Sequence, residues 1–230
     1  MAIDEKTKIE IIRESIRRLE EEDWDDKEKG TKDTGPAIYD RSLEIVKNTD
    51  LRNANNLNLE SIIQDFLYRW GSMGRVLGRE KFEHWEPALI KQIRVCSADL
   101  EELRKKDLLH ENLDRYRSVI MKLYDSFRAK VDSPIAVVKI LHLICPDFFP
   151  LWDNSIANGV RAERKTDTKE KNFTAGDYYE FMKDLQAFGK KYEGTLSDLA
   201  RQYKKTKLKI LDEFLLWTVR NPFSFFLPAN

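Results

Sequence analysis

Residues 133–144, SPIAVVKILHLI, constrain the fold more than any other stretch of the chain. As a helix, this segment carries apolar side chains in almost every direction, which is typical of a helix enclosed by other elements. Ser133 is a suitable N-cap, Pro134 suits the first helical position, and Pro146 stops the helix. The rest of the chain must therefore supply the elements that bury it.

Apolar residues recur every three or four positions in most of the remaining chain, which predicts further helices. These are expected over residues 4–23, 37–47, 58–77, 87–105, 108–127, 153–160, 174–188 and 207–219. No alternating β-branched run and no Asn-Gly or Asp-Gly hairpin signals a strand. We expect an all-α fold of nine to ten helices in one globular domain over residues 1–230, with two helical lobes around a cleft as one arrangement. Periodicity is lost near residues 24–36 and 161–173, where we expect exposed loops.

Gly71 and Gly74 fall in the second half of the helix expected over residues 58–77, and Gly78 follows directly, where the helix could continue. Glycine inside a helix costs about 1 kcal/mol relative to alanine. Either this face permits a close approach of backbone or ligand, or the helix ends at Gly71.

The chain carries 40 basic and 40 acidic side chains, so its overall field attracts neither nucleic acid nor an anionic membrane. A polyanion site would have to be a local patch. No run reaches the roughly 18 apolar residues that span a bilayer. Cys96 and Cys145 belong to no metal-binding motif. We expect a soluble, cytoplasmic protein with no membrane anchor, no metal and no cofactor.

Lys139 and His142 lie three residues apart and share the one polar stripe of the buried helix. Asp153 follows the aromatic turn of residues 148–152 and has the character of an N-cap. In one interpretation Lys139 and His142 face solvent and Asp153 only caps a helix. In the other, the Lys139 amine is a nucleophile or a positioned cation, with Asp153 as its electrostatic partner. His142 fits a structural histidine better than a general base.

The stretch from Ser133 to Val160 resembles the 8-oxoguanine glycosylase-like group of helix-hairpin-helix base-excision DNA glycosylases. The resemblance rests on a lysine in an apolar helix, a proline-containing turn and an aspartate that caps the next helix. It implies that Lys139 attacks the sugar C1′ to give a Schiff base, and that Asp153 assists departure of the base. It also implies DNA as the partner.

Such enzymes flip a nucleotide into a pocket and hold the DNA backbone with cations. Pocket candidates are His142, Trp70, Phe149 and Trp152, and phosphate-contact candidates are Arg69, Arg75, Arg79, Arg161, Arg164 and Lys165. The glycosylases place a Gly-x-Gly hairpin before their lysine, whereas FRAKVDSPIAVV contains no glycine. The alternative is a noncatalytic all-α module that binds a protein or nucleic acid.

Overall fold

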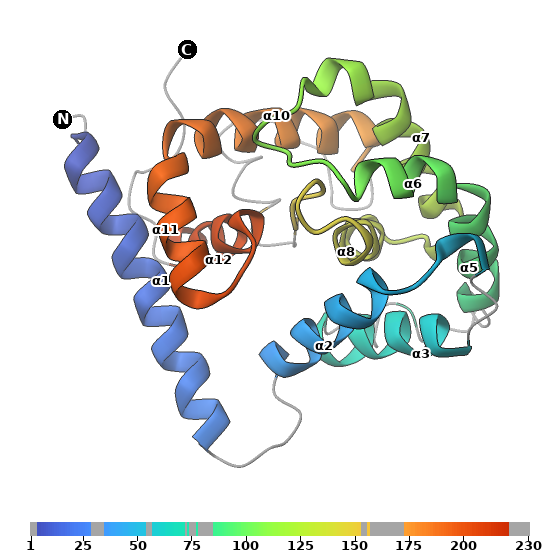
Figure 1. Ribbon diagram of the computed structural model, residues 1–230, viewed down its shortest axis with the longest axis horizontal. Helices are drawn as coiled ribbons and strands as arrows, with labels where there is room; N and C mark the ends of the chain where they lie inside the picture. The colour runs from blue at the N-terminus through green and yellow to red at the C-terminus, as the bar shows by residue number, and fades with distance from the viewer. Residues whose placement is uncertain are drawn as a thin grey trace.

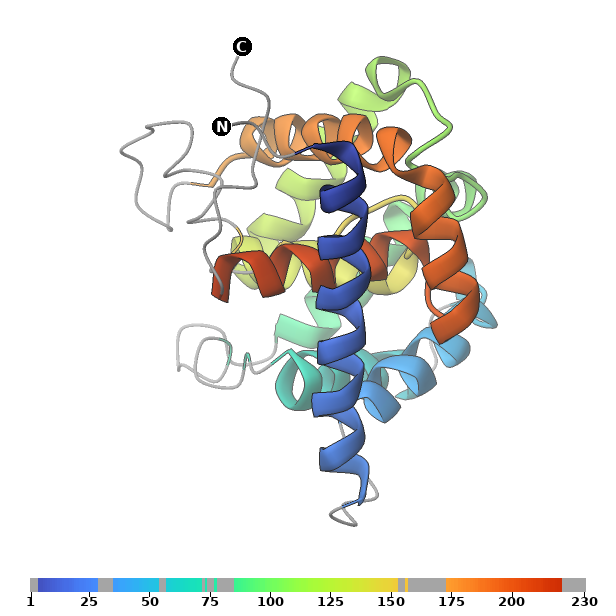
Figure 2. The same cartoon turned by 90° about the vertical axis from the view of Figure 1, so that its left-hand side faces the viewer.

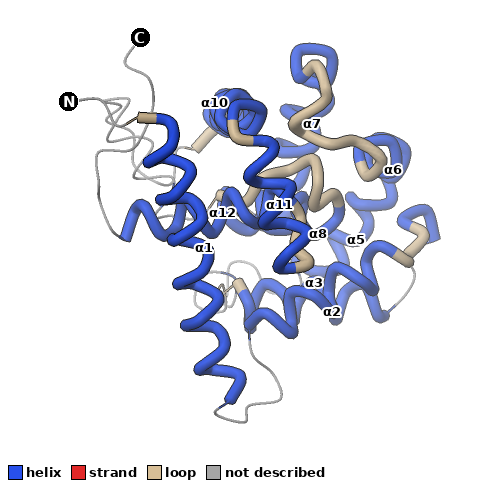
Figure 3. The backbone as a smooth tube through the Cα atoms, turned by 60° about the vertical axis from the view of Figure 1, so that its left-hand side comes forward, coloured by secondary structure: helices blue, strands red, loops and turns tan. Residues whose placement is uncertain are grey.

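The structure is a computed structural model that describes residues 4–28, 35–53, 57–71, 73, 77, 85–152, 156 and 173–220. Within these ranges the regular elements are helices, and no strand is present (Figure 3). The all-α fold expected from the sequence is therefore confirmed.

The described part of the chain forms ten α-helices (Figure 1). They are α1 (Glu5–Glu28), α2 (Gly35–Lys47), α3 (Leu57–Asp65), α5 (Trp85–Val95), α6 (Ser97–Leu103), α7 (Leu113–Val131), α8 (Pro134–Ile144), α10 (Ala175–Lys191), α11 (Glu193–Tyr203) and α12 (Lys207–Arg220). The described residues also form a 3-10 turn, η1 (Leu51–Asn53), and a π-helical turn, η2 (Phe66–Trp70).

Helix α8 lies at the centre of the fold (Figure 1). Every residue of this helix except Lys139 is buried. The Ser133 hydroxyl caps the helix by accepting the Ala136 amide, and Pro134 occupies the first turn, as the sequence predicts. Helices α7 and α2 and the turn η2 pack against α8. Burial of each large aliphatic side chain is worth about 1.5–3 kcal/mol, so this helix anchors the core.

The surrounding helices pack in two groups. Helix α1 packs on α11 and α12, and α11 also contacts α10. In the other group, α2, α3, η2, η1, α5 and α6 pack on one another. Helix α7 contacts both groups through α5 and α10. The first helix thus lies against the last, and Figure 2 shows α1 crossing in front of α12.

Several helix boundaries differ from the expected ones. Helix α1 extends to Glu28 and α2 begins at Gly35, so the loop expected over residues 24–36 is too long at both ends. The added turn of α1 has no apolar periodicity, but it contains good helix formers such as Glu and Lys. Of the loop expected over residues 161–173, only Phe173 is described. It is buried because its ring packs on Trp152, 4.5 Å away between centroids.

Other helices also differ from the expected ones. The helix expected over residues 108–127 begins at Leu113 because the Asn112 side chain accepts the Asp114 amide. The helix expected over residues 87–105 is interrupted at Cys96. Helix α11 was not predicted. Helix α10 begins with the capping box that the spacing of Thr174 and Asp177 in the sequence predicts.

One guanidinium joins the C-terminal ends of two helices. Arg104 donates to the carbonyl of Val46 near the end of α2, at 2.8 Å, and to that of Thr49, two residues beyond the helix, at 3.0 Å. It also donates to the carbonyl of Ile144, the last residue of α8, at 3.2 Å. The last carbonyls of a helix lack intrahelical donors and carry partial negative charge. Arg104 therefore satisfies both helix ends and fixes α2 relative to α8.

We expect Arg104→Met to lower the free energy of unfolding by about 3 kcal/mol, because it removes a charged donor from three partly buried carbonyls. Urea denaturation monitored by circular dichroism measures the loss. The matched control is Arg201→Met, because Arg201 is 78% exposed and pairs only weakly with Asp198. The control should change stability by less than about 0.5 kcal/mol. Equal effects of the two substitutions would contradict a clamping role for Arg104.

Candidate functional site

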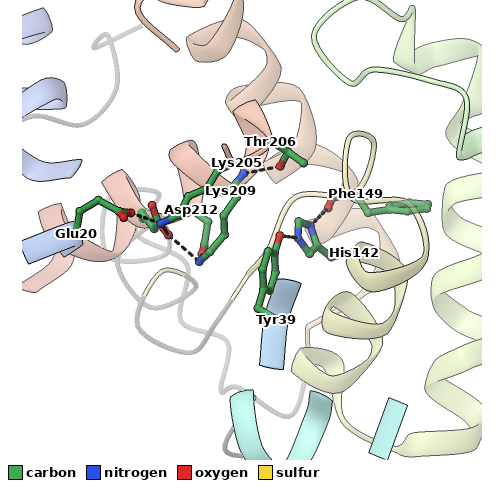
Figure 4. Close-up of polar contacts among 9 residues, drawn as sticks. Glu20, Tyr39, His142, Phe149, Lys205, Thr206, Lys209 and Asp212 are labelled. Atoms are coloured by element: carbon green, nitrogen blue, oxygen red, sulfur yellow. Dashed lines mark hydrogen bonds and ion pairs between the residues drawn. The ribbon is translucent and has the colours of Figure 1, made fainter. Parts of the chain in front are cut away.

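His142 is completely buried, and both of its ring nitrogens are hydrogen-bonded. Nδ1 lies 2.7 Å from the Phe149 carbonyl oxygen, and Nε2 lies 2.6 Å from the Tyr39 hydroxyl (Figure 4). Because a carbonyl only accepts, Nδ1 must carry the proton, and the Tyr39 hydroxyl must donate to Nε2. Burial lowers the pKa of His142 to about 3. His142 is thus neutral, is held in one tautomer and does not face solvent.

Lys139 is half-buried, and its amine contacts the turn η2. Its Nζ donates to the Gly71 carbonyl oxygen at 2.8 Å and lies 5.4 Å from the centroid of the Trp70 ring. A Cβ on Gly71 would stand 2.7 Å from the carbonyl oxygen of Leu67, so the π-helical turn leaves no room for a side chain there. The interpretation in which Lys139 and His142 both face solvent is therefore wrong. The helix expected over residues 58–77 breaks at Gly71.

A second lysine reaches the same aromatic surface from α12. Lys209 Nζ lies 5.5 Å from the Trp70 centroid and 5.4 Å from the Tyr39 centroid, and the two rings are 5.2 Å apart. Only 12% of the Lys209 side chain is exposed. Its amine contacts the carboxylates of Asp212 at 2.7 Å and Glu213 at 3.4 Å. Burial acts to lower the pKa of Lys209, but the two carboxylates outweigh it, so the pKa is raised and the amine is charged.

These charges continue toward α1. Lys205 contacts Glu213 at 2.6 Å and also pairs with Glu20 of α1 (Figure 4). We call the five residues Glu20, Lys205, Lys209, Asp212 and Glu213 the α12 charge cluster. Buried charges are tolerated when they are paired and hydrogen-bonded. Within the cluster, Glu213 Oε2 is buried and makes no hydrogen bond.

The other two aromatic pocket candidates lie in the core. Phe149 is fully buried and Trp152 is 3% exposed. Both rings stack beside Tyr178, at 6.4 and 5.8 Å between centroids, and the Tyr178 hydroxyl donates to the Pro150 carbonyl at 2.8 Å. Phe149 and Trp152 therefore pack against protein rings in the core, because the turn after α8 folds them against α10.

The remaining predicted site residues are only partly described. Arg69 lies on η2, and its guanidinium is 3.5 Å from the Asp65 carboxylate. Asp153, Arg75, Arg79, Arg161, Arg164 and Lys165 lie outside the described residues. Contact between Lys139 and Asp153 therefore stays a prediction. Among the predicted residues, the structure brings Lys139 to Trp70 and His142 to Phe149.

Four residues of this site were not singled out from the sequence: Tyr39, Lys209, Asp212 and Glu213. One signal could have indicated three of them. Lys209, Asp212 and Glu213 are spaced i, i+3 and i+4 within the otherwise apolar run LKILDEFLLW, which places them on one face of a helix. Opposite charges on one face of an apolar helix predict a buried ion pair. Tyr39 carried no comparable signal.

Among the described side chains, no group of three His, Cys, Asp or Glu residues is arranged to hold a metal ion. No helix in the described part of the chain is both long enough and apolar enough to cross a membrane. Comparison with known proteins found no matching family model, no matching curated protein and no matching solved structure.

The low pKa of His142 predicts a loss of stability in mild acid. Its ordinary pKa is 6.5 and its folded value is about 3, so below pH 6.5 the unfolded chain takes up a proton that the folded protein does not. Stability should therefore fall as pH decreases, by about 2–3 kcal/mol between pH 6.5 and 4.5. Hydrogen bonds from Lys191 to Glu5 and from Arg17 to Glu14 lower the pKa values of these two carboxyl groups to about 2 from 4.5. Their protonation therefore changes stability mainly below pH 4.5.

Urea unfolding at several pH values measures this loss. The control is His142→Asn, whose amide can still donate to the Phe149 carbonyl but does not titrate. We expect the variant to be less stable at pH 7 and to lack most of the slope between pH 6.5 and 4.5. The same slope in both proteins would show that His142 is not its source.

Proposed function

We propose that this protein acts on DNA as a base-excision glycosylase-like enzyme, in which the Lys139 amine attacks the sugar C1′. In this proposal the protein is cytoplasmic and takes part in DNA repair. The observation that supports it is the contact between Lys139 and Trp70. It joins the expected nucleophile to one of the aromatic surfaces expected to hold the flipped nucleotide.

The position of Lys139 suits this chemistry in two ways. It is the one residue of α8 that is not buried, so a rigid, enclosed helix carries its amine. The amine donates a hydrogen bond to the Gly71 carbonyl at the end of η2, which holds it beside the Trp70 ring. In a complex, a substrate would displace this backbone contact.

The reaction balances as follows. The Lys139 nitrogen forms a bond to C1′, and the bond from C1′ to the base breaks, with its electron pair leaving on the base. The base then takes up a proton. The bond from C1′ to the ring oxygen then breaks, with its electron pair leaving on that oxygen, which takes up a proton. The two protons of the attacking amine thus end on the base and on the ring oxygen, and an imine joins Lys139 to C1′.

One observation favours a noncatalytic module that binds nucleic acid or protein. The bond from Lys139 to Gly71 joins α8 to η2, just as the His142 and Tyr39 bond joins α8 to α2. In that alternative both polar residues of α8 stabilise the packing of the helix and carry out no chemistry.

Borohydride trapping on a panel of oligonucleotides with damaged bases tests the enzyme proposal. We expect a covalent adduct with the wild-type protein and none with Lys139→Ala. Lys139→Arg keeps the charge but should also give no adduct, because a guanidinium does not form the imine. The matched control is Lys122→Ala, because Lys122 of α7 is 63% exposed and pairs with Asp99 of α6, which contacts none of the site residues described above.

A parallel assay for released base covers a glycosylase that makes no covalent intermediate. No adduct and no released base on any substrate would overturn the enzyme proposal. An adduct that persists in Lys139→Ala would overturn the assignment of the nucleophile.

A further inference from the structure

Two lysine amines from distant parts of the chain converge on one indole ring. Lys139 comes from α8 and Lys209 from α12, and their Nζ atoms lie 5.4 and 5.5 Å from the centroid of Trp70. Tyr39 is in contact with the same ring and with Lys209. The surroundings of Lys139 therefore include the charges of α12 as well as those of its own helix.

The charges that α12 brings are fixed in place. Lys209 is held by Asp212 and Glu213, and Glu213 is held in turn by Lys205. Lys209 carries one positive charge beside two carboxylates, so it offsets one of the two negative charges that α12 places near the Trp70 ring. Without Lys209 that offset is lost, and the added negative charge near the ring favours a charged Lys139 amine.

We propose that Lys209 is a positioning residue for Lys139, whose ammonium charge on the shared Trp70 surface makes the Lys139 amine lose its proton more readily. The proposal rests on the proposed function in taking Lys139 as the reacting amine. It is nevertheless a statement about the free protein and can be tested without DNA.

Two effects of removing Lys209 act in the same direction. A positive neighbour disappears, and Asp212 and Glu213 lose the cation that offsets them. Both changes hold the proton on Lys139 more firmly. Removing the charge of Asp212 should have the opposite effect, because Lys209 and Glu213 stay in place.

Other titratable groups around α8 stay the same in these comparisons. Arg41 of α2 and Arg69 of η2 both pair with Asp65, and Tyr39 bonds to the neutral His142. On α7, burial raises the pKa of Tyr124, which therefore stays neutral. Any further group that faces Lys139 is likewise present in each variant, so the differences report the α12 charges.

The test is the rate at which the Lys139 amine reacts with acetic anhydride from pH 7 to 11, followed for each lysine by mass spectrometry. Only the neutral amine reacts, so the rate reports how readily Lys139 loses its proton. We expect Lys209→Met to slow the labelling of Lys139 about threefold or more at pH 8. Asp212→Asn should accelerate it by a similar factor. Lys209→Arg keeps the charge and should restore most of the wild-type rate.

A purely structural role for Lys209 gives a different pattern. Loosened packing would expose Lys139 and accelerate its labelling in every destabilised variant, so slower labelling in Lys209→Met and faster labelling in Asp212→Asn distinguish the two roles. An unchanged or faster rate in Lys209→Met would overturn the proposal. If that variant does not fold, equal rates in Asp212→Asn and the wild type would overturn it.

The labelling of Lys122 of α7, which pairs with Asp99 of α6, serves as the internal control and should be the same in all variants. Failure of borohydride trapping with normal labelling shifts would remove the enzyme proposal and leave this inference standing. Successful trapping without labelling shifts would support the enzyme proposal and overturn the role of Lys209.

Discussion

The fold depends on hydrogen-bonding one imidazole at its centre. Helix α8 can be enclosed on nearly every side only if its polar side chains find partners, because an unpaired buried polar group costs about 1–3 kcal/mol. His142 finds two, the Tyr39 hydroxyl of α2 and the Phe149 carbonyl of the turn after α8. These two bonds hold the three segments together, and their geometry fixes one neutral tautomer. The arrangement of α2, α8 and the aromatic turn follows from them.

The same constraint shapes the charged part of the molecule. Lys209 lies against the Tyr39 ring, so the residue that satisfies His142 also lies against the α12 charge cluster. Burying Lys209 is tolerable because Asp212 and Glu213 contact its amine, and Lys205 and Glu20 extend the pairing to α1. Helix α1 therefore closes a continuous path of polar contacts and rings that begins at α8. Its packing on α12 is electrostatic as well as apolar, since Ile12 and Ile16 are buried along the same helix.

Sequence patterns predicted the fold well where a short-range signal decides the structure. The Ser133 cap, the Thr174 and Asp177 capping box and the apolar periods specify their helices locally. Boundaries failed where tertiary or backbone effects decide, as at the π-helical turn before Gly71 and the interruption at Cys96. Trp70 was predicted to lie at the site and does contact Lys139. Phe149 and Trp152 lie in the core instead, because the sequence does not reveal that Tyr178 of α10 packs against them.

The sequence did not indicate that Lys209 lies at the site, and the reason for this is general. A sequence motif contains residues that are close along the chain, so for Lys139 it indicates charges only in the turn and cap that follow α8. Lys209 is 70 residues beyond Lys139, and only the packing of α12 against the Tyr39 and Trp70 rings brings both amines to the same indole. Electrostatic neighbours decide whether a lysine acts as a cation or as a nucleophile. The local resemblance to glycosylases therefore suggests which lysine would react, while helix α12 adds charges at the Trp70 ring that this lysine contacts.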